Sequence, residues 1–262
     1  MKRVLFFAAI LTVSVCVANE ITSSNVLGIL PVTSSAKRTI VAVPWCAMSA
    51  TDNAAIQVSN VVKTANLTVG DMLHYVNSNG NYLSWRLANG AGDVKYWESV
   101  NIATEGGFTV SPNAHDQAVA RGNCIVLIRQ YPGTKENPNT FYLYGQVGTS
   151  ASVETSVVAG TAETPAYTLI GAPTAAAWSV NDAGISWGEV GSKDCLFVPG
   201  NNGWNTRLVW SDSKWCCQQL VIGDDGAITG STLRPYTMPI PAGRGVWYVS
   251  YGGAPTIRWT AK

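Results

Sequence analysis

The chain has 262 residues, of which 13% are charged and 10% aromatic, and its formal net charge at pH 7 is +1. Average domains carry about 25% charged residues, so this low share, together with 10 Trp and 25 Gly, is typical of an extracellular all-β protein. A charge so close to neutral argues against nucleic acid as a partner, because nucleic-acid binding needs a basic stripe.

The first 18 residues have the pattern of a secretory signal peptide. A basic start (Lys2-Arg3) precedes an apolar core (residues 4–15) and a small-residue cleavage site that ends at Ala18. We therefore expect a bacterial protein that is secreted, or held at the cell surface or in the periplasm. A lipoprotein anchor at Cys16 is the weaker alternative, since the residue before it is not small. No later segment is apolar enough to span a bilayer, so no membrane span is expected after signal removal.

The first half of the mature chain is predicted to consist mostly of short strands. Apolar residues in the segment 56–65 recur at helical spacing, which predicts one short helix. The dipeptide Asn79-Gly80 between two apolar runs predicts a hairpin, because both residues tolerate positive φ. Residues 105–117 are expected to form a loop. Strands are predicted at residues 26–32, 39–44, 72–76, 82–87, 94–97, 124–129 and 140–147.

The same order of elements restarts after residue 165. Short, evenly spaced strands with turn signals between them indicate a sandwich or a barrel. The predicted fold class is all-β, with two tandem related β-sandwich or barrel-like units and one short helix in the first. The expected units are residues 19–147 and 166–262, and residues 148–165 form a linker or an edge strand. Strands of the second unit are predicted at residues 167–173, 196–198, 206–210, 246–249 and 256–259.

Both halves carry one set of motifs, and a repeat of this kind decides the architecture. Asp71 stands 50 residues before Arg121, and Asp194 stands 50 residues before Arg244; Gly follows Arg in both places. Arginines repeated in this way could bind an anionic ligand. We favour a structural role, in which they pair with Asp71 or Asp194 in each copy.

Two further arginines, Arg86 and Arg207, recur with the hairpins of the two halves. The same choice applies to them, and we again favour a structural ion pair over a ligand contact.

Removal of the signal peptide, which contains Cys16, leaves an odd number of Cys residues. An exported protein can form disulfides, and an odd count leaves one thiol over. We expect Cys195 and Cys216 to pair, because both lie in predicted strands of one repeat. Cys46 with Cys124 is the second choice, and Cys217 would then be left over. The alternative is that several of them are small buried apolar residues.

Four segments of the first half carry a family resemblance. They are Val43-Pro44-Trp45, the hairpin start Leu67–Asp71, the turn Ala120-Arg121-Gly122 and the strand end Gly145-Gln146-Val147. With the signal peptide, they make the chain similar to uncharacterised secreted β-rich proteins of the Planctomycetes–Verrucomicrobia–Lentisphaerae group. The resemblance is weaker in the second half. It implies an exported β-rich fold and brings no activity with it.

Catalytic and metal motifs do not hold up in this sequence. Gly184–Gly188 fits the Gly-x-Ser-x-Gly pattern, but that motif needs a strand–turn–helix setting and a later His, and both His74 and His115 lie upstream. Two distant His cannot make a zinc site. Asp224-Asp225-Gly226 could hold calcium, but a plain turn is the better explanation. We expect no cofactor, no metal and no catalytic residue.

The aromatic residues are the best indication of binding. Trp204 lies in a predicted turn, flanked by Asn202 and Asn205, where a flat ring and amide groups could hold a sugar. Most other Trp residues lie in predicted strands at matching positions, such as Trp97 and Trp215, and are expected to be core.

The sequence thus favours an exported, non-enzymatic surface or extracellular structural protein. Its expected partners are further copies of itself or components of the cell envelope, because a strand such as residues 26–32 could pair between molecules. The alternative is a carbohydrate-binding protein that holds glycans with loop aromatics. An enzyme is the third possibility, since a glycosidase needs only carboxylates in a cleft.

Overall fold

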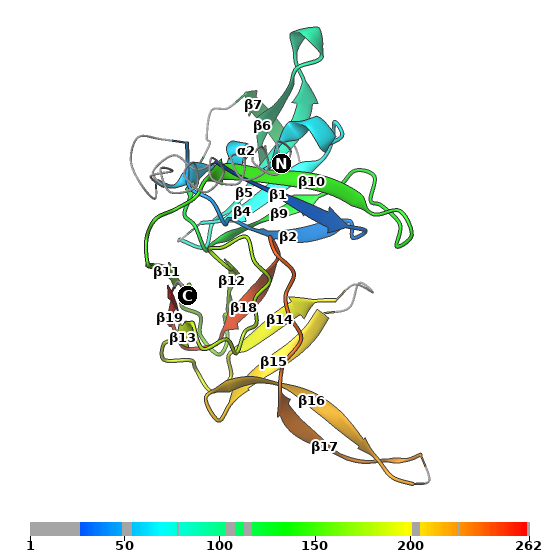
Figure 1. Ribbon diagram of the computed structural model, residues 1–262, viewed down its shortest axis with the longest axis vertical. Coiled ribbons are helices and arrows are strands. Elements are labelled where there is room, and N and C mark those ends of the chain that lie inside the picture. Colours follow the sequence, from blue (N-terminus) through cyan, green and yellow to red (C-terminus); the bar gives the residue numbers. More distant parts are fainter. Residues whose placement is uncertain are drawn as a thin grey trace, which may run out of the picture.

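The computed structural model describes residues 27–48, 54–77, 79–102, 108–112, 117–200, 205–224 and 226–260. Within these ranges the protein consists mainly of antiparallel sheets, which remain open, and of short helical turns. The predicted all-β fold class is confirmed. Figure 1 shows two groups of strands, one from each half of the chain, stacked along the long axis.

A six-stranded antiparallel sheet forms the centre of the first half. Its strands are short and rich in β-branched and aromatic residues, which suit a pleated surface. The central strand β9 reads Cys-Ile-Val-Leu-Ile and is almost wholly buried, as expected for a strand covered on both faces. The spatial order is β2 (Arg38–Ala42), β9 (Cys124–Ile128), β4 (Met72–Val76), β5 (Tyr82–Asn89), β6 (Lys95–Ile102) and β7 (Phe108–Pro112).

A second six-stranded sheet occupies the centre of the second half. In both sheets the first of the six strands along the chain lies at one edge, the last lies next to it, and the other four follow in chain order. The predicted hairpins 72–87 and 196–210 take equivalent places as β4–β5 and β14–β15. The order is β12 (Ala166–Gly171), β18 (Gly245–Ser250), β14 (Cys195–Pro199), β15 (Asn205–Ser211), β16 (Lys214–Ile222) and β17 (Ile228–Pro235).

Smaller sheets and turns cover one face of each large sheet. In the first half β1 pairs with β10 along its whole length, and in the second half β11 and β13 flank β19. Each half is therefore a two-layer sandwich around its own core. The additional elements are β1 (Leu27–Ser34), β10 (Asn139–Gln146), β3 (Ile56–Gln57), β8 (Ala118–Val119), β11 (Ser152–Ser156), β13 (Ile185–Trp187), β19 (Thr256–Thr260), α2 (Val58–Val61), η2 (Thr64–Asn66) and η3 (Ala91–Asp93).

Two separate cores lie inside these sandwiches. Trp85 and Leu143 are fully buried in the first, and Trp215 and Tyr248 are fully buried in the second. A third apolar cluster lies between the two large sheets and includes Ile40. The two halves therefore contact each other through apolar side chains as well as through backbone.

The contact between the halves is reciprocal. Asn123 of the first half forms a β-bridge with Ile170, and Arg244 of the second half forms one with Val41. The Gly171 amide donates to the Gly122 carbonyl, and the Ala42 amide donates to the Gly243 carbonyl, each over 3.0 Å. Strands β2 and β12, which end their sheets, are thereby covered by the opposite half, as in the self-complementary interface of a two-fold dimer.

Three elements differ in detail from what the sequence predicted. The expected short helix within 56–65 is present but is limited to a single turn, α2, because the β-branched Val62 is extended and forms a bridge to Leu143. Part of the expected loop 105–117 forms the edge strand β7. The segment Ile228–Pro235, for which no strand was predicted, forms the edge strand β17.

Candidate functional site

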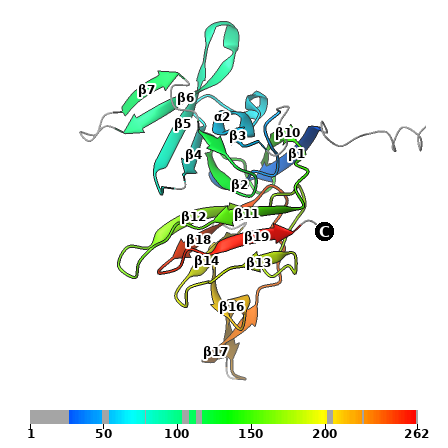
Figure 2. The same ribbon diagram turned by 90° about the vertical axis from the view of Figure 1, so that its left-hand side faces the viewer.

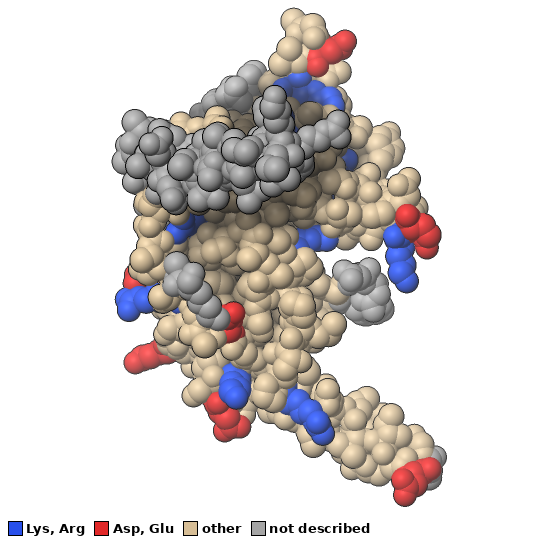
Figure 3. Space-filling view, in the orientation of Figure 1, with Lys and Arg blue, Asp and Glu red and all other residues tan. Residues whose placement is uncertain are grey.

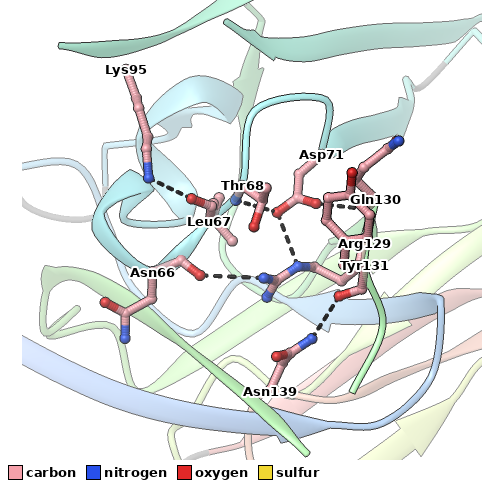
Figure 4. A network of polar contacts seen from close by, with 9 residues as sticks. All are labelled: Asn66, Leu67, Thr68, Asp71, Lys95, Arg129, Gln130, Tyr131 and Asn139. Carbon is pink, nitrogen blue, oxygen red and sulfur yellow. Dashed lines mark hydrogen bonds and ion pairs between the residues drawn. The ribbon is translucent and has the colours of Figure 1, made fainter. Parts of the chain in front are cut away.

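A buried carboxylate lies at the start of the first hairpin. Asp71 is fully buried, and its Oδ2 accepts the Thr68 amide at 2.8 Å while its Oδ1 accepts the Gln130 amide at 2.6 Å. The Nε atom of Arg129 lies 2.9 Å from Oδ2. Figure 4 shows these groups converging from the loop before β4 and the end of β9.

The cation beside Asp71 is buried as well. Arg129 is 5% exposed and its Nη2 donates to the Asn66 carbonyl at 3.3 Å. Its Nε–H does not point straight at the carboxylate, so the contact is an ion pair rather than a directed hydrogen bond. A buried pair of this kind fixes the loop to the sheet, because loss of either partner would leave an uncompensated charge in the interior.

The second half holds an equivalent carboxylate with a different partner. Asp194 is buried, accepts the Gly191 amide at 2.9 Å and accepts the Tyr251 amide at 2.7 Å. The Tyr248 hydroxyl donates to its Oδ2 at 2.7 Å. Burial and this hydrogen bond raise the pKa of Tyr248 far above its usual value, so the phenol stays protonated as the donor.

Arg121 and Arg244 do not pair with these aspartates, and that prediction is wrong. Arg86 does form the expected structural ion pair, with Glu98 as its partner at 2.6 Å. Arg121 donates to the Ser150 carbonyl and Arg244 to the Thr33 carbonyl. The ion-pair partner of Asp71 is Arg129, which follows the end of a strand and belongs to no repeated motif.

The repeated Arg-Gly dipeptides also occupy different positions in the two sheets. The registers place Asn123, not Arg121, in the position that Arg244 takes in the second half. The glycines that correspond are Gly122 and Gly243, and both have positive φ. Arg121 and Arg244 therefore stand at the same distance in sequence from Asp71 and Asp194, but they are not equivalent in the structure, because the loops before the two strands differ in length.

The predicted disulfide between Cys195 and Cys216 is not formed. Both residues are buried thiols, and they lie on β14 and β16 with β15 between them. Two strand spacings amount to about 10 Å, whereas bridged Cα atoms lie within about 7 Å. The second choice, Cys46 with Cys124, is not bridged either. Burial raises the pKa of Cys124 well above its usual value.

The predicted sugar-binding residues fall mostly outside the described residues. Trp204 and Asn202 lie there, whereas Asn205 is exposed at the start of β15. None of the nine described Trp residues is exposed, and Trp97 and Trp215 hold corresponding buried positions opposite Leu87 and Trp210. The expectation that strand Trp residues form the core is thus supported.

His74 lies on β4 with its ring largely buried. Its Nδ1 lies 3.0 Å from the Ser84 hydroxyl, and its ring lies 4.9 Å from that of Tyr82. Burial first, and the nearby Arg38 second, lower the pKa of His74 to about 4. His115 and Asp225 lie outside the described residues; among those described, no group of His, Cys, Asp or Glu could hold a metal ion.

A hollow of about 310 Å³ opens where the two halves meet, and we call it the junction hollow. Its walls are small residues such as Ala151 and Pro173, and the buried rings of Trp178 and Trp259 pack edge to face at 5.1 Å beneath it. Arg121 and Asp182 also line it. The hollow thus combines apolar walls with one donor and one acceptor of opposite charge.

A long hairpin leaves the body of the second half, and no other described element covers its outer part. We call its outer part the arm, which comprises Gln218–Ile222 of β16, all of β17 and the described residues of the turn between them. Every residue of β17 is exposed, as is each residue from Gln218 to Ile222. Figure 1 shows the arm reaching away from the sheets at the lower right, and Figure 2 shows the same hairpin from the side.

One face of the arm is apolar. Residues opposite each other in a ladder lie on the same face, and Leu233 faces Gln218 while Ser231 faces Leu220. Ile222, two residues beyond Leu220, belongs to the same face. Ile228, which pairs with Ile222, lies on it too. Leu220, Ile222, Leu233 and Ile228 are 60%, 65%, 49% and 65% exposed. The opposite face carries Cys217, Gln219, Val221, Gly230, Thr232 and Arg234.

Charge is distributed unequally along the arm. Arg207 of β15 lies at its base, where it lines a hollow of about 280 Å³ together with Val209 and Leu233. Asp224 lies in the turn at the tip, which is closed by a 2.8 Å bond from the Gly223 amide to the Ala227 carbonyl. Figure 3 shows acidic atoms at the tip, a basic group near the base and an uncharged stretch between them.

A local sequence pattern could have predicted the arm. Two apolar runs, Leu220–Ile222 and Ala227-Ile228, flank a turn with an Asp-Gly pair, which is a recognised hairpin pattern. Only the structure reveals that no other part of the described chain covers the resulting apolar face.

Comparison with known proteins adds no further guide to this chain. No family model, no curated protein and no solved structure matches it. Within the described residues, no helix is both long and apolar enough to cross a membrane.

Proposed function

We propose that this protein is an exported, non-enzymatic structural protein that associates with further copies of itself through the arm. The observation that carries the proposal is the exposed apolar face of Leu220, Ile222 and Leu233 on a hairpin that leaves the body. The expected signal peptide supports a place outside the cell.

The arm is physically unsuited to remain alone in water. An isolated two-stranded hairpin is at best marginally stable, and large exposed apolar patches on soluble proteins usually mark interaction sites. Strand β17 also presents a free edge, because among the described strands only β16 pairs with it. A partner that covers the apolar face would remove it from water, whereas the free edge of β17 could pair only with an added strand.

The positions of the free sheet edges favour association between molecules. The inner edge strands, β2 and β12, are covered by the opposite half, whereas β7 and β17 end their sheets on the far sides. Natural proteins usually protect long edges with charge or Pro. In β17 only the last two residues, Arg234 and Pro235, offer such protection.

We also infer that the two halves arose by duplication of one β-rich unit. The equal strand orders, the equivalent buried aspartates and the reciprocal bridges support this inference. A unit that already pairs with its own copy inside one chain is suited to build larger assemblies.

The test is the mass of the mature chain, from Asn19 onward, measured by size-exclusion chromatography with light scattering over a range of concentrations. We expect a multiple of the single-chain mass that falls on dilution. The triple variant Leu220→Ser, Ile222→Ser, Leu233→Ser should remain a single chain, because serine removes most of the apolar face, of which only Ile228 is left, while the backbone ladder stays.

The matched control changes the opposite face of the same strands. Gln219→Ala with Thr232→Ala should associate like the original protein. A wild-type protein that stays a single chain at every concentration would refute the proposal, and so would a triple variant that associates as strongly as the control.

Carbohydrate binding is the second candidate function, and the junction hollow favours it. Ligand pockets begin at about 300 Å³, and the hollow offers Arg121 as donor and Asp182 as acceptor for sugar hydroxyls. A glycan array probed with the mature chain is the test. Binding that is lost in Asp182→Ala and kept in Glu163→Ala, an exposed carboxylate elsewhere, would support this site; an empty array would reject it.

A further inference from the structure

We propose that two arms associate as a two-fold pair, apolar face against apolar face, with the tip of each arm over the base of the other. This inference rests on the proposed self-association and specifies its geometry. The occupant of the apolar face is therefore the arm of a second copy of this chain, and the contact is the same for both partners.

Complementary charges select this arrangement. Arg207 lies beside Gln218 at the base, since its neighbour Leu208 pairs with Cys217. Asp224 lies in the tip turn, six residues beyond Gln218, or about 20 Å along the strand. In a parallel pair, Arg207 would meet Arg207 at the bases and Asp224 would meet Asp224 at the tips, so that like charges repel at both ends. In the antiparallel pair each Arg207 meets the partner's Asp224, which attracts.

The apolar side chains match in the same register. A two-fold axis that places Arg207 over the partner's Asp224 passes through the level of Val221, midway between residues 218 and 224. Leu220 of each arm then lies opposite Ile222 of the other arm. One position of the axis therefore joins apolar to apolar and positive to negative residues.

The hollow at the base of one arm can accept the tip of the partner arm. It is bounded by Arg207, Val209, Gln218 and Leu233 and measures about 280 Å³. Gln218 donates to the Ser231 hydroxyl at 2.8 Å, so its amide is already engaged within the arm. Arg207 is the exposed cation that borders this hollow, and it is the group that an acidic tip would reach.

Charge reversal tests the arrangement directly. Arg207→Glu and Asp224→Arg should each weaken self-association about tenfold or more, because each single variant places like charges together twice in the pair. An equimolar mixture of the two single variants should associate as strongly as the original protein, since both contacts are then attractive. The double variant should also recover, and light scattering measures all four samples.

Arg234→Glu is the control, because Arg234 lies at the base of the arm on the opposite face; its association should be unchanged. Failure of the mixture to recover, while the apolar triple variant still abolishes association, would overturn the tip-to-base geometry and leave self-association intact. A wild-type protein that never associates would overturn both.

Discussion

At the scale of single residues, the two buried aspartates show how one position can be kept while its partner changes. Asp71 and Asp194 accept equivalent backbone amides, from the residue three before and from the end of the neighbouring strand. The remaining donor is a cation, Arg129, in one half and a phenol, Tyr248, in the other. Their substitution should therefore have unequal costs.

Asp71→Asn should lower the free energy of unfolding by about 3–5 kcal/mol, because it leaves the guanidinium of Arg129 buried without a counter-charge. Asp194→Asn should cost about 1–3 kcal/mol, the penalty for mismatched hydrogen bonds around a buried group. Denaturant unfolding of the two variants measures the difference. Equal losses would contradict the assigned roles.

His74 predicts a pH dependence of stability. Its pKa is about 4 in the folded protein and close to 6.5 when unfolded, so acid protonates the unfolded chain first. The contribution of the neutral ring is complete above about pH 6.5 and is lost as the pH falls towards 4.

We expect this loss to reach about 1 kcal/mol, since solvent partly reaches the ring and screens the effect. Unfolding of wild type and His74→Gln over this pH range measures it. The stability advantage of the wild type should shrink in acid, and parallel curves would contradict the prediction.

At the scale of elements, two glycines allow the large sheets to approach each other. A Cβ atom at Gly245 would clash with the Cys124 sulfur and lie 2.6 Å from the Ile170 carbonyl, and one at Gly171 would lie 2.6 Å from the same sulfur. These positions belong to β18 and β12, which face the first half. Their small size is required by the contact between sheets rather than by a turn.

Gly245→Ala should therefore destabilise the protein by about 1–3 kcal/mol, the usual cost of overpacking a close contact. Gly252→Ala is the matched control, because nothing lies within 4 Å of its added carbon. Thermal unfolding followed by tryptophan fluorescence compares the two. A Gly245→Ala protein as stable as the control would show that the sheets separate without cost.

Local patterns predicted most elements but not all of them. The Asn-Gly turn and its flanking apolar runs correctly predicted β4 and β5, because turn chemistry and alternation act over a few residues. The short helix expected in 56–65 is present but ends after one turn, because Val62 is held extended by Leu143, a partner 81 residues away. Strand β17 was missed because its residues are exposed and lack the alternation of a half-buried strand.

At the scale of the whole molecule, the halves meet through their inner sheet edges and leave the outer ones free. The reciprocal bridges between Asn123 and Ile170 and between Arg244 and Val41 cover β12 and β2. The outer strands β7 and β17 remain at the far ends, as Figures 1 and 2 show. This arrangement is the reason that we place self-association at the arm and not between the halves.

The sequence by itself determined the all-β class, most strands and the recurrence of motifs in two halves, because periodicity and turn chemistry are local. Tertiary structure alone decided which residues meet: Asp71 with Arg129, Cys195 apart from Cys216, and the arm without a cover. Such contacts depend on strand order and loop length, and these arise from packing across distances that no local pattern encodes.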